Sequence, residues 1–356
     1  MKKLFSLTLL LTGLCITRLT AQQIVWTHHF TGTGTNDPVA SAYDDSNNLY
    51  VVGNFSGSVS IDGNNLTSYG GSVDVFLLKI SASGSFEWIE QIGSDLADEA
   101  EGIIVTGDGT VLICGAFKDT CDFGGTTLIS YGGFDAFLAK YNTSGTLQWT
   151  KRIAWGPDDD RTRDIGNEND NYFLVSGYYR DSAYFGLTAY HPANDTLFWN
   201  TFTNNFAAKY DTDGNFIWVQ NYPGTQNITK INCVDYSKNG YYATGLYRND
   251  FTIGATTLTA DGALPDVFLF RMDTSGAVEW IREIHGADAE SNYSLSVDTA
   301  GNVYCNGFVS SAAAEFDSTD VETSAIAYTF LGSQDYFVAK YDSAGTLQWY
   351  DVKGGA

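Results

Sequence analysis

Apolar and polar residues along this chain follow a pattern that occurs five times, each copy reading as a strand, a tight turn and a second strand. In every copy a Phe precedes a Trp by 12 residues, a basic residue follows the Phe by three, and a Gly precedes the Trp by four. The unit contains no insertion. This predicts a β-hairpin, because one added residue would turn the following side chains to the other face of the sheet. The repeated aromatic residues are Phe76, Phe137, Phe206, Phe268, Phe337, Trp88, Trp149, Trp218, Trp280 and Trp349.

A second motif, a short apolar run that ends in Gly, lies before each hairpin. It occupies residues 48–53, 110–115, 172–177, 240–245 and 302–307. A nearly continuous apolar run of this length indicates a strand buried on both faces. Turn residues and a further strand candidate precede it, so one repeat contains four strands. Almost all length variation falls between the second and third strands, which predicts a surface connection there.

Repeats of 61 to 69 residues with four antiparallel strands are typical of β-propeller blades. We therefore expect an all-β fold, a β-propeller over residues 22–356 whose Phe and Trp side chains lie between blades. The predicted blades are 37–93, 98–154, 161–222, 229–285 and 290–352. Residues 24–30 resemble a lone outer fourth strand without its three partners, and the chain stops at Ala356. A chain truncated at its C-terminus is the expected explanation. A closed five-bladed ring with one surplus strand is the alternative.

The run from Phe137 to Trp149, with residues 301–307 and 121–128, resembles the SBBP-type β-propeller repeat of secreted bacterial proteins. The resemblance extends over residues 24–354 and recurs in register. It implies a propeller fold, an extracellular location and no shared catalytic residues. Proteins of this kind often end in a sorting domain, so the resemblance also implies outer-membrane secretion machinery as a partner, reached through a C-terminal tail that this sequence lacks.

The first 21 residues have the features of a secretory signal, with Lys2 and Lys3 before an apolar stretch and Ala21 before the expected cleavage point. The chain is expected to be secreted or displayed at the cell surface. No later apolar run is long enough to span a bilayer. The formal net charge of −23 opposes binding to nucleic acid and to anionic membranes. Four cysteines follow the signal, and both disulfides and buried thiols are open to them: Cys114, Cys121, Cys233 and Cys305.

Acidic residues are common where one repeat leads into the next. Asp37, Asp98, Asp164 and Asp288 lie in these connections, which share one face of a propeller. They predict a rim that binds Ca²⁺ or a cationic ligand, against the simpler interpretation of solvated loops in an acidic protein. The segment 211–215 resembles the start of a calcium loop, but it lacks the distal Glu and is better explained as a turn.

The third repeat is the irregular one, and it holds two tryptophans outside the pattern. Off-pattern aromatic rings beside carboxylates are typical of carbohydrate-binding sites, although packing of an exposed loop is the simpler and favoured explanation. No carboxylate pair stands out for glycoside hydrolysis, and no GxSxG motif is present, so no catalytic residue is assigned. The candidate ligand-binding residues are Trp155, Asp158, Asp159, Asp160, Arg161 and Trp199.

These observations predict a secreted, non-enzymatic β-propeller that binds a carbohydrate or protein ligand in adhesion or surface display. One alternative is a propeller enzyme acting on polysaccharide, as a glycoside hydrolase or lyase. Another is a structural repeat spacer of a larger cell-surface protein. Irregularity confined to one repeat favours a local binding site over a spacer.

Overall fold

The computed structural model describes residues 26–186, 196–223, 229–260, 262, 264–311, 314–316 and 334–354, with backbone alone for residues 196–202. The predicted signal at residues 1–21 lies outside this range. Within it the secondary structure is almost entirely strand, with one 3₁₀ turn at Tyr69–Gly71. None of the described segments forms a helix long and apolar enough to cross a membrane.

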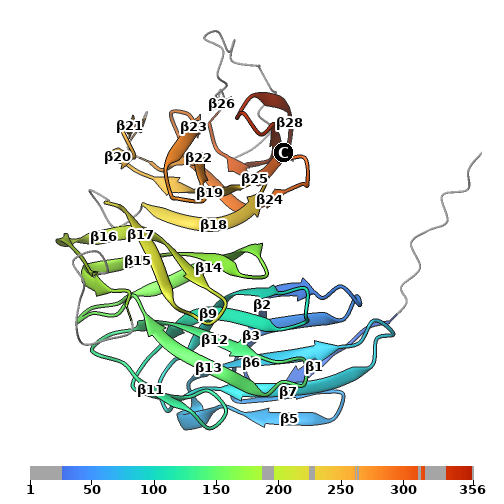
Figure 1. Ribbon diagram of the computed structural model, residues 1–356. Helices are drawn as coiled ribbons and strands as arrows, with labels where there is room; N and C mark the ends of the chain where they lie inside the picture. The colour runs from blue at the N-terminus through green and yellow to red at the C-terminus, as the bar shows by residue number, and fades with distance from the viewer. Residues whose placement is uncertain are drawn as a thin grey trace, which may run out of the picture.

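Five antiparallel sheets follow one another along the chain, each with four long strands and the fourth with a short fifth strand added, which confirms the all-β fold class with its four-stranded units (Figure 1). The first two sheets consist of β2 (Asn36–Tyr43), β3 (Leu49–Ser56), β6 (Val73–Ile80), β7 (Phe86–Ile92), β8 (Glu99–Val105), β9 (Val111–Phe117), β12 (Asp135–Tyr141) and β13 (Leu147–Ile153). The last three consist of β14 (Arg161–Asn169), β15 (Tyr172–Tyr184), β16 (Thr196–Asp211), β17 (Phe216–Tyr222), β18 (Lys230–Ser237), β19 (Gly240–Tyr247), β22 (Asp266–Asp273), β23 (Val278–His285), β24 (Glu290–Val297), β25 (Val303–Val309), β27 (Asp335–Tyr341) and β28 (Leu347–Lys353).

Each sheet contacts the next one mainly through its first strand. β2 contacts β8, β8 contacts β14, β14 contacts β18, and β18 contacts β24. Figure 1 shows this succession, and in it the blue first sheet and the red last sheet lie apart from each other. The described sheets therefore do not form the closed five-bladed ring that was the alternative expectation.

Short strands lie in the connections between second and third strands: β4 (Ser58–Ile61), β5 (Asn64–Thr67), β10 (Thr120–Asp122), β11 (Thr127–Ile129), β20 (Asp250–Ile253), β21 (Thr256–Thr259) and β26 (Glu315–Phe316). These connections reach back to the fourth strand of the preceding repeat. β26 pairs with β23, and isolated bridges join Gly93 to Asp122 and Trp155 to Tyr184. The variable connections therefore also fasten neighbouring sheets together, which their variable length did not reveal.

The N-terminal segment lies beside the first sheet in the position that the fourth strand of a preceding repeat takes beside each later sheet. β1 (Phe30–Gly32) pairs with β4, just as β23 pairs with β26. Trp26 lies against Gly84, in the turn between β6 and β7. Regular pairing begins only at Phe30, so the strand lies at residues 30–32 rather than over the predicted 24–30, of which residues 24 and 25 are outside the described range. The segment nevertheless occupies the position of a fourth strand.

The apolar core is divided among the junctions between sheets. One cluster joins Val52 and Leu77 of the first sheet to Ile113 and Phe137 of the second, and three similar clusters join the later neighbours. All five repeat Phe side chains are at most 1% exposed. Each sits opposite the Gly that ends the second-strand motif, for example Phe137 opposite Gly115. A Cβ on Gly115 would lie 2.6 Å from the Phe ring, which explains why these two residues recur together.

Three of the five repeat Trp side chains bind the next sheet through their indole N–H group. The indole N–H groups of Trp88, Trp218 and Trp280 donate to the carbonyls of Thr143, Thr274 and Ser343, at 3.0, 3.2 and 3.1 Å. Each acceptor lies in the hairpin turn of the following repeat. The rings are half-buried rather than enclosed. The Trp therefore lies at the junction as expected, with part of its stabilisation coming from a hydrogen bond.

Two smaller expectations are decided by local geometry. All four described cysteines are free thiols, so Cys114 and Cys121 form no bridge. The segment 211–215 is a turn, in which Asp211 accepts the N–H groups of Asp213 and Asn215 at 3.0 and 2.8 Å. The Asp211 carboxylate thus stabilises the turn by accepting these backbone N–H groups.

Candidate functional site

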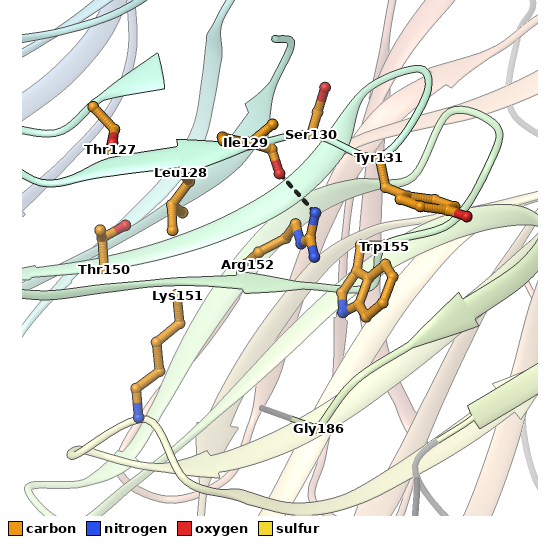
Figure 2. Close-up of a pocket in the computed structure, with 10 residues that line it drawn as sticks. All are labelled: Thr127, Leu128, Ile129, Ser130, Tyr131, Thr150, Lys151, Arg152, Trp155 and Gly186. Carbon is orange, nitrogen blue, oxygen red and sulfur yellow. Dashed lines mark hydrogen bonds between the residues drawn. The ribbon is translucent and has the colours of Figure 1, made fainter. Parts of the chain in front are cut away.

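A surface groove of about 610 Å³ lies at the junction of the second and third sheets (Figure 2). Three parts of the chain form it: residues 127–131 in and after β11, residues 150–152 of β13, and Trp155 with Gly186. The second-repeat connection supplies one wall, and the fourth strand of the same repeat supplies the floor. The groove therefore arises where a variable connection crosses the edge of a regular sheet.

Trp155 anchors one end of the groove. Its backbone pairs with Tyr184 in both directions, at 3.2 and 3.1 Å, which ties the second sheet to the third. The rings of these two residues are 4.7 Å apart and tilted by 34°, and the Tyr131 ring meets Trp155 edge-on at 5.7 Å. The Arg152 guanidinium lies 4.2 Å from the Trp155 ring centroid. These contacts use ring area on which a sugar would stack, so Trp155 is mainly a structural anchor.

The cations of the groove are held in defined positions. Arg152 donates to the Ile129 carbonyl at 2.6 Å and approaches the Asp135 carboxylate at 3.4 Å. Figure 2 shows its guanidinium between Ile129 and Trp155. Lys151 donates to the Asp213 carbonyl at 2.5 Å. Among the described residues, the lining contains these two basic side chains and no acidic one, on a chain with 42 acidic and 19 basic residues. The groove therefore favours an anionic group.

Two apolar side chains in the groove wall are open to solvent. Ile129 is 63% exposed and Tyr131 is 62% exposed. Large apolar side chains exposed side by side and flanked by cations are characteristic of binding surfaces. Neither residue stood out from the sequence, because both lie in an irregular connection. Arg152 was also missed, since it occupies a regular strand position three residues after Trp149.

Of the six predicted ligand-binding residues, Trp155 lines the groove. Asp159 and Asp160 instead accept backbone N–H groups from Phe134 and Arg180, at 3.0 and 3.1 Å. Arg161 forms an ion pair with Glu99 of the second sheet. Asp158 is exposed, and the side chain of Trp199 lies outside the described residues. The segment 159–161 thus joins sheets, which its acidic composition had concealed.

The four acids of the predicted cation rim differ in environment. Asp37 and Asp288 are exposed, Asp98 is buried and Asp164 is partly buried. Asp98 and Asp164 each accept a backbone N–H group, and desolvation raises the pKa of each to about 7. In the described part of the chain, no three His, Cys, Asp or Glu side chains gather as metal ligands. The rim stays a prediction without structural support.

Comparisons with known proteins agree with a repeat protein. No family model matches the chain. A curated relative, an uncharacterized WD repeat-containing protein of Acanthamoeba polyphaga mimivirus, is 21% identical over 410 aligned positions. The alignment covers 94% of this chain and 29% of the relative, so the chain spans less than a third of that protein's length. Among solved structures, the Pan2 WD40 domain of Neurospora crassa matches with a TM-score of 0.29 and 9% identity, covering 76% of this chain and 86% of that domain.

Proposed function

We propose that this chain is a secreted, non-enzymatic β-propeller scaffold that binds a partner protein through the groove between its second and third sheets. The observation that carries this proposal is the exposed pair Ile129 and Tyr131 beside Lys151 and Arg152. Such a surface fits a segment that combines apolar and acidic side chains. The sequence similarity to a WD repeat-containing protein supports a scaffold role.

Binding is favoured over catalysis by the chemistry of the lining. The lining residues that the structure describes include no carboxylate, histidine or cysteine to act as a general acid, general base or strong nucleophile. The basic side chains are already engaged with backbone carbonyls. A propeller enzyme would have to use another surface.

A carbohydrate ligand is the second candidate. Tyr131 supplies an exposed aromatic ring, which suits stacking against a sugar. Most of the aromatic character at the groove, however, belongs to Trp155, whose ring already contacts Arg152 and Tyr184. We therefore place protein ahead of carbohydrate.

The test uses the mature chain from residue 22 and two defined probe sets: a peptide library that varies acidic and aromatic content, and a glycan array. We expect the acidic, aromatic peptides to bind, and Tyr131→Ser to weaken that binding at least about tenfold. Tyr43→Ser is the matched control, because Tyr43 is 61% exposed but lies on the first sheet, far along the chain from the groove.

Equal loss in both variants, or no binding to either probe set, would contradict the groove as a binding site. Binding to glycans alone would establish the second candidate. Release of reducing ends from bound glycans would show an enzyme.

A further inference from the structure

Three junctions between sheets bury two carboxyl groups at equivalent places. The first acid begins the third strand of one repeat, and the second acid lies at the start of the next repeat's first strand. The pairs are Asp74 with Asp98, Asp135 with Asp160, and Asp266 with Glu290. All six side chains are at most 1% exposed. Carboxyl groups are seldom buried in this way unless something neutralises them.

The backbone holds both acids of a pair in the same arrangement each time. The N–H of the second acid donates to the carbonyl of the residue just before the first acid. These bonds run from Asp98 to Val73, from Asp160 to Phe134 and from Glu290 to Pro265, at 2.8, 2.7 and 2.9 Å. A geometry that recurs at three junctions is a property of the repeat rather than an accident of one loop.

At the first junction, each carboxyl uses one oxygen and leaves the other without a donor. Asp74 Oδ2 accepts N–H groups from Tyr69 and Gln91 at 2.9 and 2.7 Å. Asp98 Oδ1 accepts the Lys118 backbone N–H at 3.1 Å. Asp74 Oδ1 and Asp98 Oδ2 are buried and lack a hydrogen-bond partner. Ser94 and the Cys121 thiol also lie beside Asp98, and the nearby Asp74 carboxyl helps to raise the pKa of Asp98, so the two acids of the pair interact.

The second junction has the same arrangement, with one carboxyl oxygen of each acid accepting a backbone N–H. Asp135 Oδ2 accepts the Tyr131 N–H at 2.8 Å, and Asp160 Oδ1 accepts the Arg180 N–H at 3.1 Å. Asp135 Oδ1 and Asp160 Oδ2 are buried without a partner. At the remaining junction, the Asp266 carboxyl lies close enough to Glu290 to help raise its pKa, as expected for a hydrogen bond between the two carboxyl groups. Two carboxyl groups form such a bond only when one of them carries a proton.

The surrounding groups do not neutralise these pairs. Asp95 and the Cys121 thiol face the first pair. Asp158, Asp159 and the Arg152 guanidinium face the second pair, with Arg152 3.4 Å from Asp135. The hydroxyl and N–H of Ser311 face Glu290. Among these described neighbours of the first two pairs Arg152 is the one cation, so full ionisation would leave like charges buried together.

We propose that each of these carboxyl pairs shares one proton between its facing oxygens, which makes the junctions between sheets tighter at acidic pH than at neutral pH. The raised pKa values of these acids agree with a shared proton. Burial raises the pKa of Asp74 to about 6, that of Asp98 to about 7 and that of Glu290 to about 7. The folded chain then holds more protons than the unfolded chain between about pH 4 and pH 7, so stability falls as the pH rises through that window.

The junction of the third and fourth sheets provides an internal comparison. Asn204 stands where the other repeats have the first acid, and Thr229 precedes β18 where they have the second. Both side chains are uncharged and fully buried. This position accordingly holds no carboxyl pair. It also shows that the site accommodates an amide, which makes Asp→Asn a conservative test.

The test measures the urea midpoint of the mature chain at about pH 5 and about pH 8, in the presence of a chelator. We expect the wild-type midpoint to fall on going to pH 8, and the combined variant Asp98→Asn, Asp160→Asn to lose at least about half of that fall. Asp45→Asn is the control, because Asp45 is exposed in a turn and should leave the fall unchanged. The infrared C=O stretch of a protonated carboxyl should be present at pH 6 in the wild type and weaker in the combined variant.

A wild-type midpoint that does not change with pH would overturn the proposal, as would a full pH dependence in the combined variant. Calcium that raises the wild-type midpoint at pH 8, but not that of the variant, would show that the pairs bind a cation instead. If the combined variant does not fold, Asn204→Asp decides the question. It should make the fall steeper by creating an additional buried acid, and an unchanged fall would refute the proposal.

Discussion

Trp280 and Trp349 occupy the same position in consecutive repeats, yet they meet different surroundings. Both rings contact a tyrosine of their own sheet, at 6.0 Å for Tyr242 and 6.3 Å for Tyr304. Trp280 also donates to the Ser343 carbonyl in the following repeat. Trp349 is 45% exposed, and no further repeat follows it in the described chain. The repeat motif thus builds one half of a junction, and the hairpin turn of the next repeat supplies the other half.

The largest loss of stability should come from the repeat Phe, which is buried in every sheet whether or not another repeat follows. Phe137→Ala should cost about 3–5 kcal/mol, because it empties a cluster shared by the first two sheets. Urea unfolding gives the free energy, with Tyr131→Ala as the exposed control. An unchanged midpoint for Phe137→Ala would remove the basis for placing this Phe in the core of a junction.

The two tryptophans themselves should differ next. Trp280→Ala should cost about 2–3 kcal/mol, since it removes a half-buried ring and a hydrogen bond. Trp349→Ala should cost less than about 1 kcal/mol, because nearly half of its surface already faces solvent. The same unfolding measurement compares them. Equal costs would mean that the following repeat contributes nothing at this position.

The smallest expected effect is the contribution of the indole hydrogen bond alone, apart from the burial of the ring. Trp88→Phe should cost about 1 kcal/mol, because it removes the donor to the Thr143 carbonyl. Trp149→Phe should be nearly neutral, because the Trp149 indole nitrogen is buried without a hydrogen-bond partner. These paired substitutions remove the same atoms, so a difference between their midpoints reports on the bond. Equal midpoints would show that the bond contributes nothing net.

The candidate groove was only partly predictable, for a physical reason. Trp155 was recognisable because it breaks the repeat pattern. Tyr131 lies in a variable connection, and only the folded chain shows that this connection passes beside β13. Asp158 to Arg161 looked like a ligand site in the sequence, but three of these four residues bind neighbouring parts of the protein. Composition alone does not distinguish a carboxylate that awaits a ligand from one that already accepts a backbone N–H.

The sequence by itself determined the strands, their order within each sheet and the burial of the repeat Phe. This follows because periodicity and the fixed spacing from Phe to Trp act within a single repeat, over distances that a hairpin spans. The tertiary structure alone decided the contacts between repeats: the carbonyls that Trp88, Trp218 and Trp280 reach, the backward pairing of the variable connections, and the approach of two carboxyl groups across a junction. The Trp partners lie 55 to 63 residues away in the next repeat. The other contacts involve irregular segments or cross from one repeat to the next, where no periodic pattern records which groups meet.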